Sequence, residues 1–166
     1  MSALSHVPAM IPRPRAVDRP VRWVEAFSRR RSLRPTAVYA VGGFGVAVTG
    51  LHFASMGLFL YSKIWWWDLL VHALSGFGVA AVLYVYQPRL ARGVFAVFVV
   101  LPLLVLAIGT WFEVYERLFT DFWIHWSRAY YLEDTGVDLV ADTAGALVFS
   151  LLLWLPARTV GAYARF

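Results

Sequence analysis

The chain has 166 residues, of which 60% are hydrophobic and 15% are charged, and its formal net charge is +5. An ordinary soluble domain carries roughly 25% charged residues; a soluble fold of this length could not bury so much apolar surface, so we expect the chain to be embedded in lipid. The sequence contains no cysteine, which excludes disulfides, thiolate nucleophiles and metal sites built from cysteine.

Residues 1–34 form a basic tail that holds eight of the fifteen Lys and Arg residues. We predict residues 1–20, which are rich in Pro and Arg and lack apolar periodicity, to be disordered. They do not read as a signal peptide, because no apolar segment follows at the usual distance. Residues 21–33 place apolar side chains at helical spacing, which predicts either a short interfacial helix on anionic lipid or a solvated basic segment. Because the tail has few aromatic side chains, we do not expect it to bind nucleic acid.

Residues 35–158 contain four apolar stretches, and each is close to the ~20 residues that an α-helix needs to cross a bilayer. They predict an all-α integral membrane four-helix bundle that fills this domain. We expect the aromatic segment 118–131 to lie flat on the outer membrane surface, with or without forming a second short interfacial helix, and residues 159–166 to form a short tail. The four stretches cover residues 36–61, 66–86, 93–113 and 136–155.

The distribution of basic residues predicts the orientation of the bundle. Twelve Lys and Arg residues lie in the two tails and in the connection between the second and third stretches, whereas three lie on the other side. The positive-inside rule therefore places both termini in the cytoplasm, and an even number of spans agrees with this. The three basic residues of the outer side are Lys63, Arg117 and Arg128.

Small residues recur at four-residue spacing within the predicted spans, and such pairs let helices approach closely in lipid. They predict close packing of the four helices without indicating which helices meet. The pairs are Gly43 with Ala47, Gly50 with Ala54, Gly76 with Ala80, and Ala141 with Gly145.

Ionisable side chains gather at one level in the outer halves of the predicted spans. Within a span they recur at spacings of three or four residues, so they share one helix face. Four helices that bring imidazole and carboxylate groups to one level predict a polar pocket that opens outward. The second span carries Asp68 and His72, the third ends with Glu113 and Glu116, the fourth begins with Asp134, Asp138 and Asp142, and the first carries His52.

The outward-facing pocket is predicted to bind a divalent transition metal or another polar ligand. A charged side chain at the centre of a spanning helix costs about 2.5–3.5 kcal/mol, and carboxylates at one level repel each other, so we expect a partner that offsets this charge. Carboxylates with imidazole suit Zn, Mn or Fe. The alternative is that these carboxylates are simply hydrated at the interface or are favourable charges at helix N-termini. The predicted ligands are Asp68, His72, Glu113, Asp138 and Asp142, surrounded by His52, Glu116, Asp134 and Arg117, with Glu116 as a candidate general base.

Three segments, in this order along the chain, resemble motifs of the VanZ-like and YjdF-type families of small multi-pass membrane proteins. Residues 67–72, WDLLVH, together with Gly76 are similar to the start of the second helix in these families. Residues 113–116, EVYE, are similar to the glutamate pair that ends their third helix, and residues 138–146, DLVADTAGA, to their fourth-helix motif. The resemblance implies a compact four-helix bundle in the prokaryotic cytoplasmic (inner) membrane. It implies no defined reaction, because these families are largely of undefined function.

Three functions are left open as hypotheses. The first is a bundle that binds a ligand or metal in the outward-facing pocket, with or without enzymatic activity. The second is a non-catalytic accessory or assembly subunit of a larger membrane complex, whose partners besides the lipid bilayer are other membrane proteins or further copies of the chain. The third is a small transporter, which we expect less because the inner halves of the predicted spans lack ionisable residues.

Overall fold

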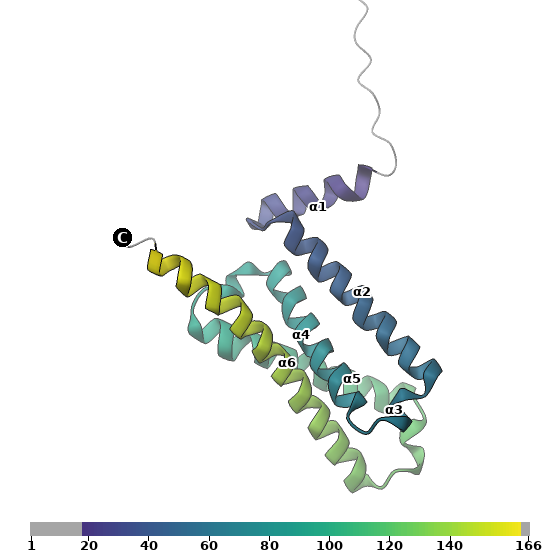
Figure 1. Cartoon of the computed structure of the whole chain (residues 1–166). Helices are drawn as coiled ribbons and strands as arrows, with labels where there is room; N and C mark the ends of the chain where they lie inside the picture. Colours follow the sequence, from purple (N-terminus) through teal and green to yellow (C-terminus); the bar gives the residue numbers. More distant parts are fainter. Residues whose placement is uncertain (1–17, 164–166) are drawn as a thin grey trace, which may run out of the picture.

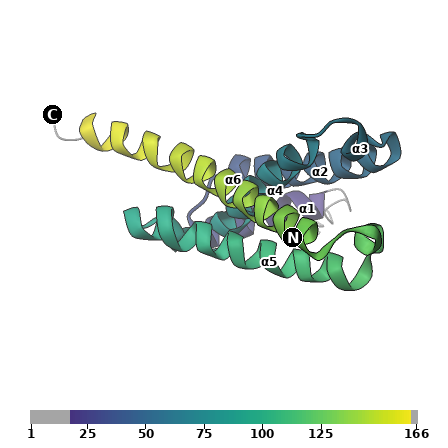
Figure 2. The same cartoon turned by 90° about the horizontal axis from the view of Figure 1, so that it is seen from below.

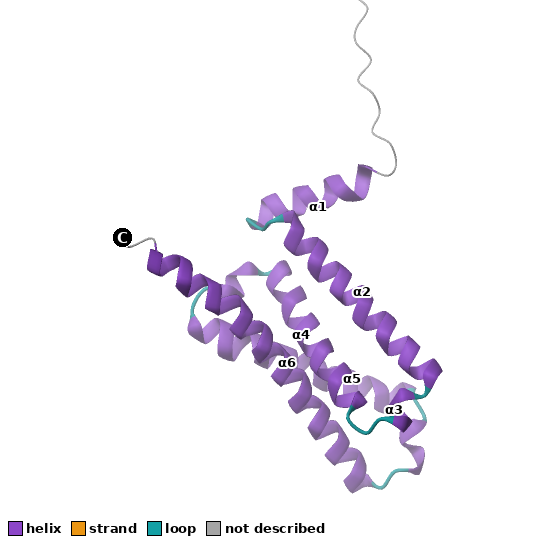
Figure 3. Ribbon diagram, in the orientation of Figure 1, coloured by secondary structure: helices purple, strands orange, loops and turns teal. Residues whose placement is uncertain are grey.

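The structure, a computed structural model, describes residues 18–163, and every regular element in this range is a helix (Figure 3). The all-α prediction is therefore confirmed. The predicted disorder of residues 1–20 lies outside the described residues, except that residues 18–20 belong to the first helix. The elements are α1 (Asp18–Arg31), α2 (Pro35–Leu58), α3 (Leu60–Lys63), α4 (Trp67–Tyr86), η1 (Pro88–Ala91), η2 (Ala96–Val100), α5 (Leu101–Phe119), η3 (Phe122–His125) and α6 (Arg128–Tyr163).

Four of these helices are long and apolar enough to cross a membrane, which confirms the predicted bundle. They run over Pro35–Leu58, Trp67–Tyr86, Ala96–Phe119 and Arg128–Leu155. The fourth begins at Arg128 rather than at residue 136, because the Ser127 hydroxyl caps it by accepting a hydrogen bond from the Tyr130 N–H at 3.1 Å. Residues 118–131 are consequently divided between the end of α5, the short η3 and the start of α6, and do not form a single surface helix.

The two ends of the bundle hold different elements (Figure 1). We call the end that holds α3, η3 and the start of α6 the site end, and the end that holds α1, η1 and the last turns of α6 the terminal end. At the terminal end, α1 lies across the start of α2. Its residues include most of the segment 21–33, for which a short interfacial helix was one of the two predictions. Both ends of the described chain lie at the terminal end, as an even number of spans requires.

The tightest helix contact is between α4 and α6, and it depends on glycine. A Cβ atom built at Gly76 would overlap with the backbone of Asp142, and one built at Gly145 would overlap with the backbone of Ala73. Both glycines belong to predicted small-residue pairs, and small residues at a helix crossing permit such backbone approach in lipid. Figure 2 shows α6 crossing the bundle diagonally with α5 on one side and α4 and α2 on the other.

A polar contact in the core ties α6 to the start of the third spanning helix. The η2 segment is a π-turn in which the Leu101 N–H bonds to the Ala96 carbonyl. The next bond of this type would come from Pro102 to the Val97 carbonyl, but proline has no N–H. The buried Ser150 hydroxyl donates to the Val97 carbonyl instead, at 2.7 Å. The third spanning helix is therefore irregular next to Pro102, and the Val97 carbonyl accepts its hydrogen bond from a neighbouring helix.

Candidate His–carboxylate site

The α4–α6 crossing sets two helical stripes of ionisable residues against each other. Asp68 and His72 lie one turn apart on α4, and Asp138 and Asp142 lie one turn apart on α6. Because Gly76 lets the backbone of Asp142 approach, the side chain of His72, one turn before Gly76, meets the acidic face of α6. A contact that brings two helix backbones together thus also assembles this group, which we call the His–carboxylate cluster: Asp68, His72, Asp138 and Asp142.

Both ring nitrogens of His72 face carboxylates. Its Nε2 lies 3.7 Å from Asp68 Oδ1 and 3.8 Å from Asp138 Oδ2, and its Nδ1 lies 3.5 Å from Asp142 Oδ1. The side chains of His72, Asp138 and Asp142 are 13%, 7% and 9% exposed, whereas that of Asp68 is 40% exposed. The cluster is therefore enclosed on the side of α6 and open where Asp68 lies.

Three members of the cluster have donor atoms at a spacing that could hold a metal ion. One ligand atom each from Asp68, His72 and Asp138 lie within 4.8 Å of one another. Asp142 faces the opposite ring nitrogen and so orients the imidazole rather than joining this triplet. The structure thus brings four of the five predicted ligands together and divides them into a group of three and a supporting carboxylate.

The fifth predicted ligand, Glu113, lies beside the cluster in a separate environment. It is 6% exposed, and its Oε2 accepts a hydrogen bond from the Thr135 hydroxyl at 2.9 Å. Its Oε1 is buried and has no hydrogen-bond partner within the described part of the chain. Glu113 therefore adds a buried carboxylate oxygen without a donor next to the cluster.

Two residues that the sequence did not single out position these carboxylates. Thr135 on α6 donates a hydrogen bond from its hydroxyl to Glu113, and it directly follows the predicted residue Asp134. Gly109 on α5 makes room for Asp142, because a Cβ atom there would lie 2.6 Å from Asp142 Oδ2. In the sequence, the feature that could have indicated Gly109 is its position one helical turn before Glu113.

The remaining predicted carboxylates belong to the same charged region. Glu116 interacts electrostatically with Asp68, His72 and Glu113, and Asp134 interacts with Asp68 and His72. No Lys or Arg forms an ion pair with any of the carboxylates of this region among residues 18–163. Six carboxyl groups therefore surround one imidazole: Asp68, Glu113, Glu116, Asp134, Asp138 and Asp142.

His52, predicted to lie near the site, reaches its edge through a tyrosine. The Nδ1 of His52 lies 2.7 Å from the hydroxyl of Tyr61, which belongs to α3, beyond the end of the first spanning helix. Burial, with a smaller contribution from Asp68 and Glu116, raises the pKa of Tyr61 to about 12. Tyr61 is therefore a neutral phenol next to the acidic region at neutral pH, and the sequence had not identified it.

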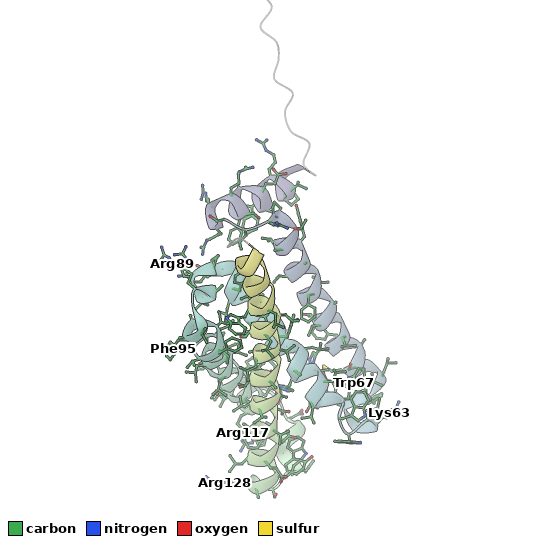
Figure 4. The ribbon with its side chains drawn as sticks, turned by 60° about the vertical axis from the view of Figure 1, so that its left-hand side comes forward. Lys63, Trp67, Arg89, Phe95, Arg117 and Arg128 are labelled. Atoms are coloured by element: carbon green, nitrogen blue, oxygen red, sulfur yellow. The ribbon has the colours of Figure 1, made fainter. Side chains whose placement is uncertain are left out.

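A second contact fixes the start of α4 on α2. The indole Nε1–H of Trp67 donates to the Ser55 hydroxyl at 2.8 Å, and this buried hydroxyl donates to the Leu51 carbonyl at 2.6 Å. Figure 4 shows Trp67 at the site end, on the same side as Lys63. This bond anchors the residue immediately before Asp68, which limits how far the open side of the cluster can move.

Arg117 is not part of the cluster, although it follows Glu113 at ion-pair spacing. Its guanidinium carbon lies 3.2 Å from the centre of the Trp123 ring and 5.1 Å from that of Tyr131. It forms no ion pair within the residues that the structure describes. Arg117, which was predicted to surround the ligands, therefore stacks on aromatic faces instead, because η3 brings Trp123 back over α5.

In a comparison with known proteins, residues 24–158 match a family model described as "Predicted membrane protein (DUF2238)". No curated protein and no solved structure matches the chain. The matched residues include all four spanning helices and the whole His–carboxylate cluster. The description is in line with a membrane protein and states no activity.

Proposed function

Because the chain belongs to the DUF2238 family of predicted membrane proteins, whose description names no activity, we propose from the site's geometry that it binds a divalent metal ion in the His–carboxylate cluster. The observation that carries this proposal is that ligand atoms of Asp68, His72 and Asp138 lie within 4.8 Å of one another and face no Lys or Arg ion pair in the described part of the chain. A divalent cation would offset the charge that this arrangement concentrates.

The ligand spacing supports this assignment. With metal–ligand bonds of about 2.1 Å, two ligands of a tetrahedral site lie about 3.4 Å apart. The separations of His72 Nε2 from the carboxylate oxygens of Asp68 and Asp138, 3.7 and 3.8 Å, exceed this by a few tenths of an ångström. A small inward movement of Asp68, the most exposed of the three, would close the triplet around an ion.

The outer partner of the histidine also fits a metal site. Metal-binding histidines usually donate their other ring N–H to a carboxylate, which selects the tautomer and the ring orientation. Asp142 Oδ1 lies 3.5 Å from His72 Nδ1, on the far side of the ring from the other two carboxylates. Asp142 would hold Nε2 as the metal ligand, with Glu113 as a further carboxylate beside the site.

The donor set of oxygen and imidazole suits Zn, Mn or Fe. Three protein ligands with an open side would leave a coordination position for water or substrate. In that case the metal would act as a Lewis acid or water activator, and Glu116, which interacts electrostatically with Asp68 and His72, is the candidate general base. Hydrolysis or oxidation of a lipid-like substrate is the reaction class that fits such a site within a membrane.

We place this site on the outer side of a prokaryotic cytoplasmic membrane. The support is the excess of Lys and Arg in the two tails and in the connection between α4 and α5. The resemblance of residues 67–72, 113–116 and 138–146 to VanZ-like and YjdF-type proteins supports the same membrane. Both termini would then be cytoplasmic.

A second candidate, an accessory or assembly subunit, is favoured by one feature of α2. One of its exposed faces carries a stripe of small residues at spacings of four and three, and a Cβ atom at each glycine of the stripe would meet nothing within 4 Å. Such a face would admit another helix at close range. The stripe consists of Gly43, Ala47, Gly50, Ala54 and Gly57, all exposed.

Metal content tests the first proposal. The detergent-purified protein, prepared without chelator, would be analysed by inductively coupled plasma mass spectrometry beside a His72→Ala/Asp138→Ala variant and an Asp121→Asn control. We expect about one equivalent of a transition metal per chain in the parent and the control, and loss of the metal from the double variant with helical circular dichroism retained. A parent without metal, even after incubation with Zn, Mn or Fe, would overturn the proposal and favour the accessory subunit.

A further inference from the structure

A basic, aromatic cavity of about 380 Å³ opens at the site end, between the last turn of α5, η3 and the first turn of α6. It is separate from the His–carboxylate cluster, and the metal proposal does not use it. The side chains that define its chemistry are Arg117, Trp123, Trp126, Ser127, Arg128 and Tyr131. Guanidinium groups that stack on aromatic rings are well suited to bind a phosphate group.

Neither arginine of the cavity forms an ion pair with a carboxylate within residues 18–163. The Arg117 guanidinium lies over the rings of Trp123 and Tyr131, which holds it away from Glu113. Arg128 is exposed and makes no ion pair among residues 18–163. Figure 4 shows both arginines at the same end of the bundle, far from Arg89 at the terminal end. The two positively charged guanidinium groups thus line one cavity, and they form no ion pair with the carboxylates of the neighbouring acidic region.

Residues that carry further donors also line this cavity. Arg128 is the first residue of α6, whose Ser127 cap accepts a hydrogen bond from Tyr130, and the N-terminus of a long helix carries positive potential. Trp123 adds a buried indole N–H that has no acceptor within the described residues. The cavity therefore combines guanidinium groups, a helix N-terminus and an unsatisfied donor.

A second, separate hollow lies further along the same pair of helices. It has a volume of about 330 Å³ and an apolar lining from α5 and α6, made by Leu106, Leu139, Val140, Thr143, Ala144 and Leu147. Leu132 of the basic cavity precedes Leu139 by two turns, so about 10 Å of helix separates them on one face of α6. On α5, Leu106 and Arg117 are likewise on one face, since eleven residues make three turns.

We propose that this seam between α5 and α6 binds an anionic phospholipid of the leaflet at the site end. Its phosphate lies in the basic cavity with Arg117 and Arg128, and one acyl chain lies in the apolar hollow beside Leu139 and Ala144. The two unneutralised guanidinium groups select a lipid with net negative charge over a zwitterionic one. The apolar hollow, which faces the hydrocarbon part of the bilayer, selects a lipid over a soluble phosphate.

Native mass spectrometry of the delipidated protein in detergent tests this proposal. The protein would be titrated with phosphatidylglycerol and with phosphatidylcholine of the same acyl chains. We expect the parent to bind phosphatidylglycerol about tenfold more tightly or better, and an Arg117→Gln/Arg128→Gln variant to lose this preference. The matched control, Arg89→Gln/Arg92→Gln, removes two exposed arginines at the terminal end and should bind like the parent.

Two further variants keep the test decisive. Arg128→Gln alone changes an exposed residue and reports the loss if the double variant does not fold. Ala144→Trp fills the apolar hollow and should weaken binding of the phospholipid without affecting the charge of the cavity. Equal binding of the two lipids by the parent would overturn the proposal, as would an equal loss in the Arg89/Arg92 control. Binding of glycerol 3-phosphate as tightly as phosphatidylglycerol, unaffected by Ala144→Trp, would identify a soluble anion as the ligand and also overturn it.

Discussion

Gly76 on α4 lies against the backbone of Asp142 on α6 so closely that a Cβ atom at position 76 would overlap with the Asp142 carbonyl. This contact sets the distance between the two helices, and the same Asp142 presents a carboxylate to His72, one turn before Gly76. Packing and site assembly therefore depend on one helix crossing.

Substituting Gly76→Ala should separate α4 from α6 and disrupt the cluster. Overpacking of a close contact costs about 1–3 kcal/mol, and we expect the midpoint of thermal unfolding in detergent to fall by several degrees. The control is Gly50→Ala, because a Cβ atom at Gly50 meets nothing within 4 Å and alanine favours the helix. Equal unfolding midpoints for the two variants would show that the crossing tolerates a methyl group.

The role of Asp142 can be separated from that of the proposed ligands. Asp142→Asn keeps an acceptor for the Nδ1–H of His72 but removes its charge, and loss of such an outer partner lowers metal affinity roughly 10–100-fold. Asp138→Asn should abolish binding, because it removes a direct ligand. Competition with a fluorescent metal chelator measures both. If Asp142→Asn lowers the affinity as much as Asp138→Asn does, Asp142 is itself a ligand.

Gly109→Ala changes no charged group yet should weaken the site. The added Cβ would lie 2.6 Å from Asp142 Oδ2, so the carboxylate has to turn away from its present position next to His72. We expect a fall in metal affinity in the same direction as for Asp142→Asn, measured by the same competition. Gly57→Ala, at an open position on α2, serves as the control. Unchanged affinity in Gly109→Ala would mean that the position of Asp142 does not control the histidine.

Glu113→Gln should stabilise the metal-free protein. Glu113 is buried, accepts one hydrogen bond from Thr135 and leaves Oε1 without a donor in the described part of the chain. An amide of the same shape keeps the acceptor for Thr135 and removes a charge from a region of like charges. We expect the midpoint of thermal unfolding, measured in the presence of a metal chelator, to rise for Glu113→Gln. It should fall for Glu113→Ala, which leaves the Thr135 hydroxyl unpaired. A fall of equal size in both variants would contradict this account.

Ionisation of Tyr61 should lower the stability of the folded protein at alkaline pH. Its pKa is raised from 10.0 to about 12, chiefly by burial, so the folded state retains the proton longer than the unfolded state. Its contribution to stability is therefore complete below pH 10.0 and is lost as the pH rises toward about 12. Absorbance at the phenolate band should show one tyrosine that titrates late and is absent from Tyr61→Phe, and the unfolding midpoint of that variant should fall less over this range. A Tyr61→Phe variant with the same titration curve as the parent would refute the assignment.

Hydropathy and helical spacing, read from the sequence alone, predicted the four spanning helices, the small residues of the α4–α6 crossing, and the faces that carry His72 and Asp138. These are local properties of each helix, set by its own residues and by the length that crosses a bilayer. The sequence also placed Arg117 around the predicted ligands, but it could not show that η3 returns Trp123 over Arg117.

Only the tertiary structure decided how the helices are rotated against each other. The approach of Gly76 to Asp142 sets which carboxylate meets which nitrogen of His72, and it separates Asp68 and Asp138 on one nitrogen from Asp142 on the other. The roles of Gly109 and Thr135 also depend on tertiary structure, because each contacts a site residue on another helix. Periodicity determines the face on which a residue lies, whereas its partner depends on packing between segments far apart in the chain.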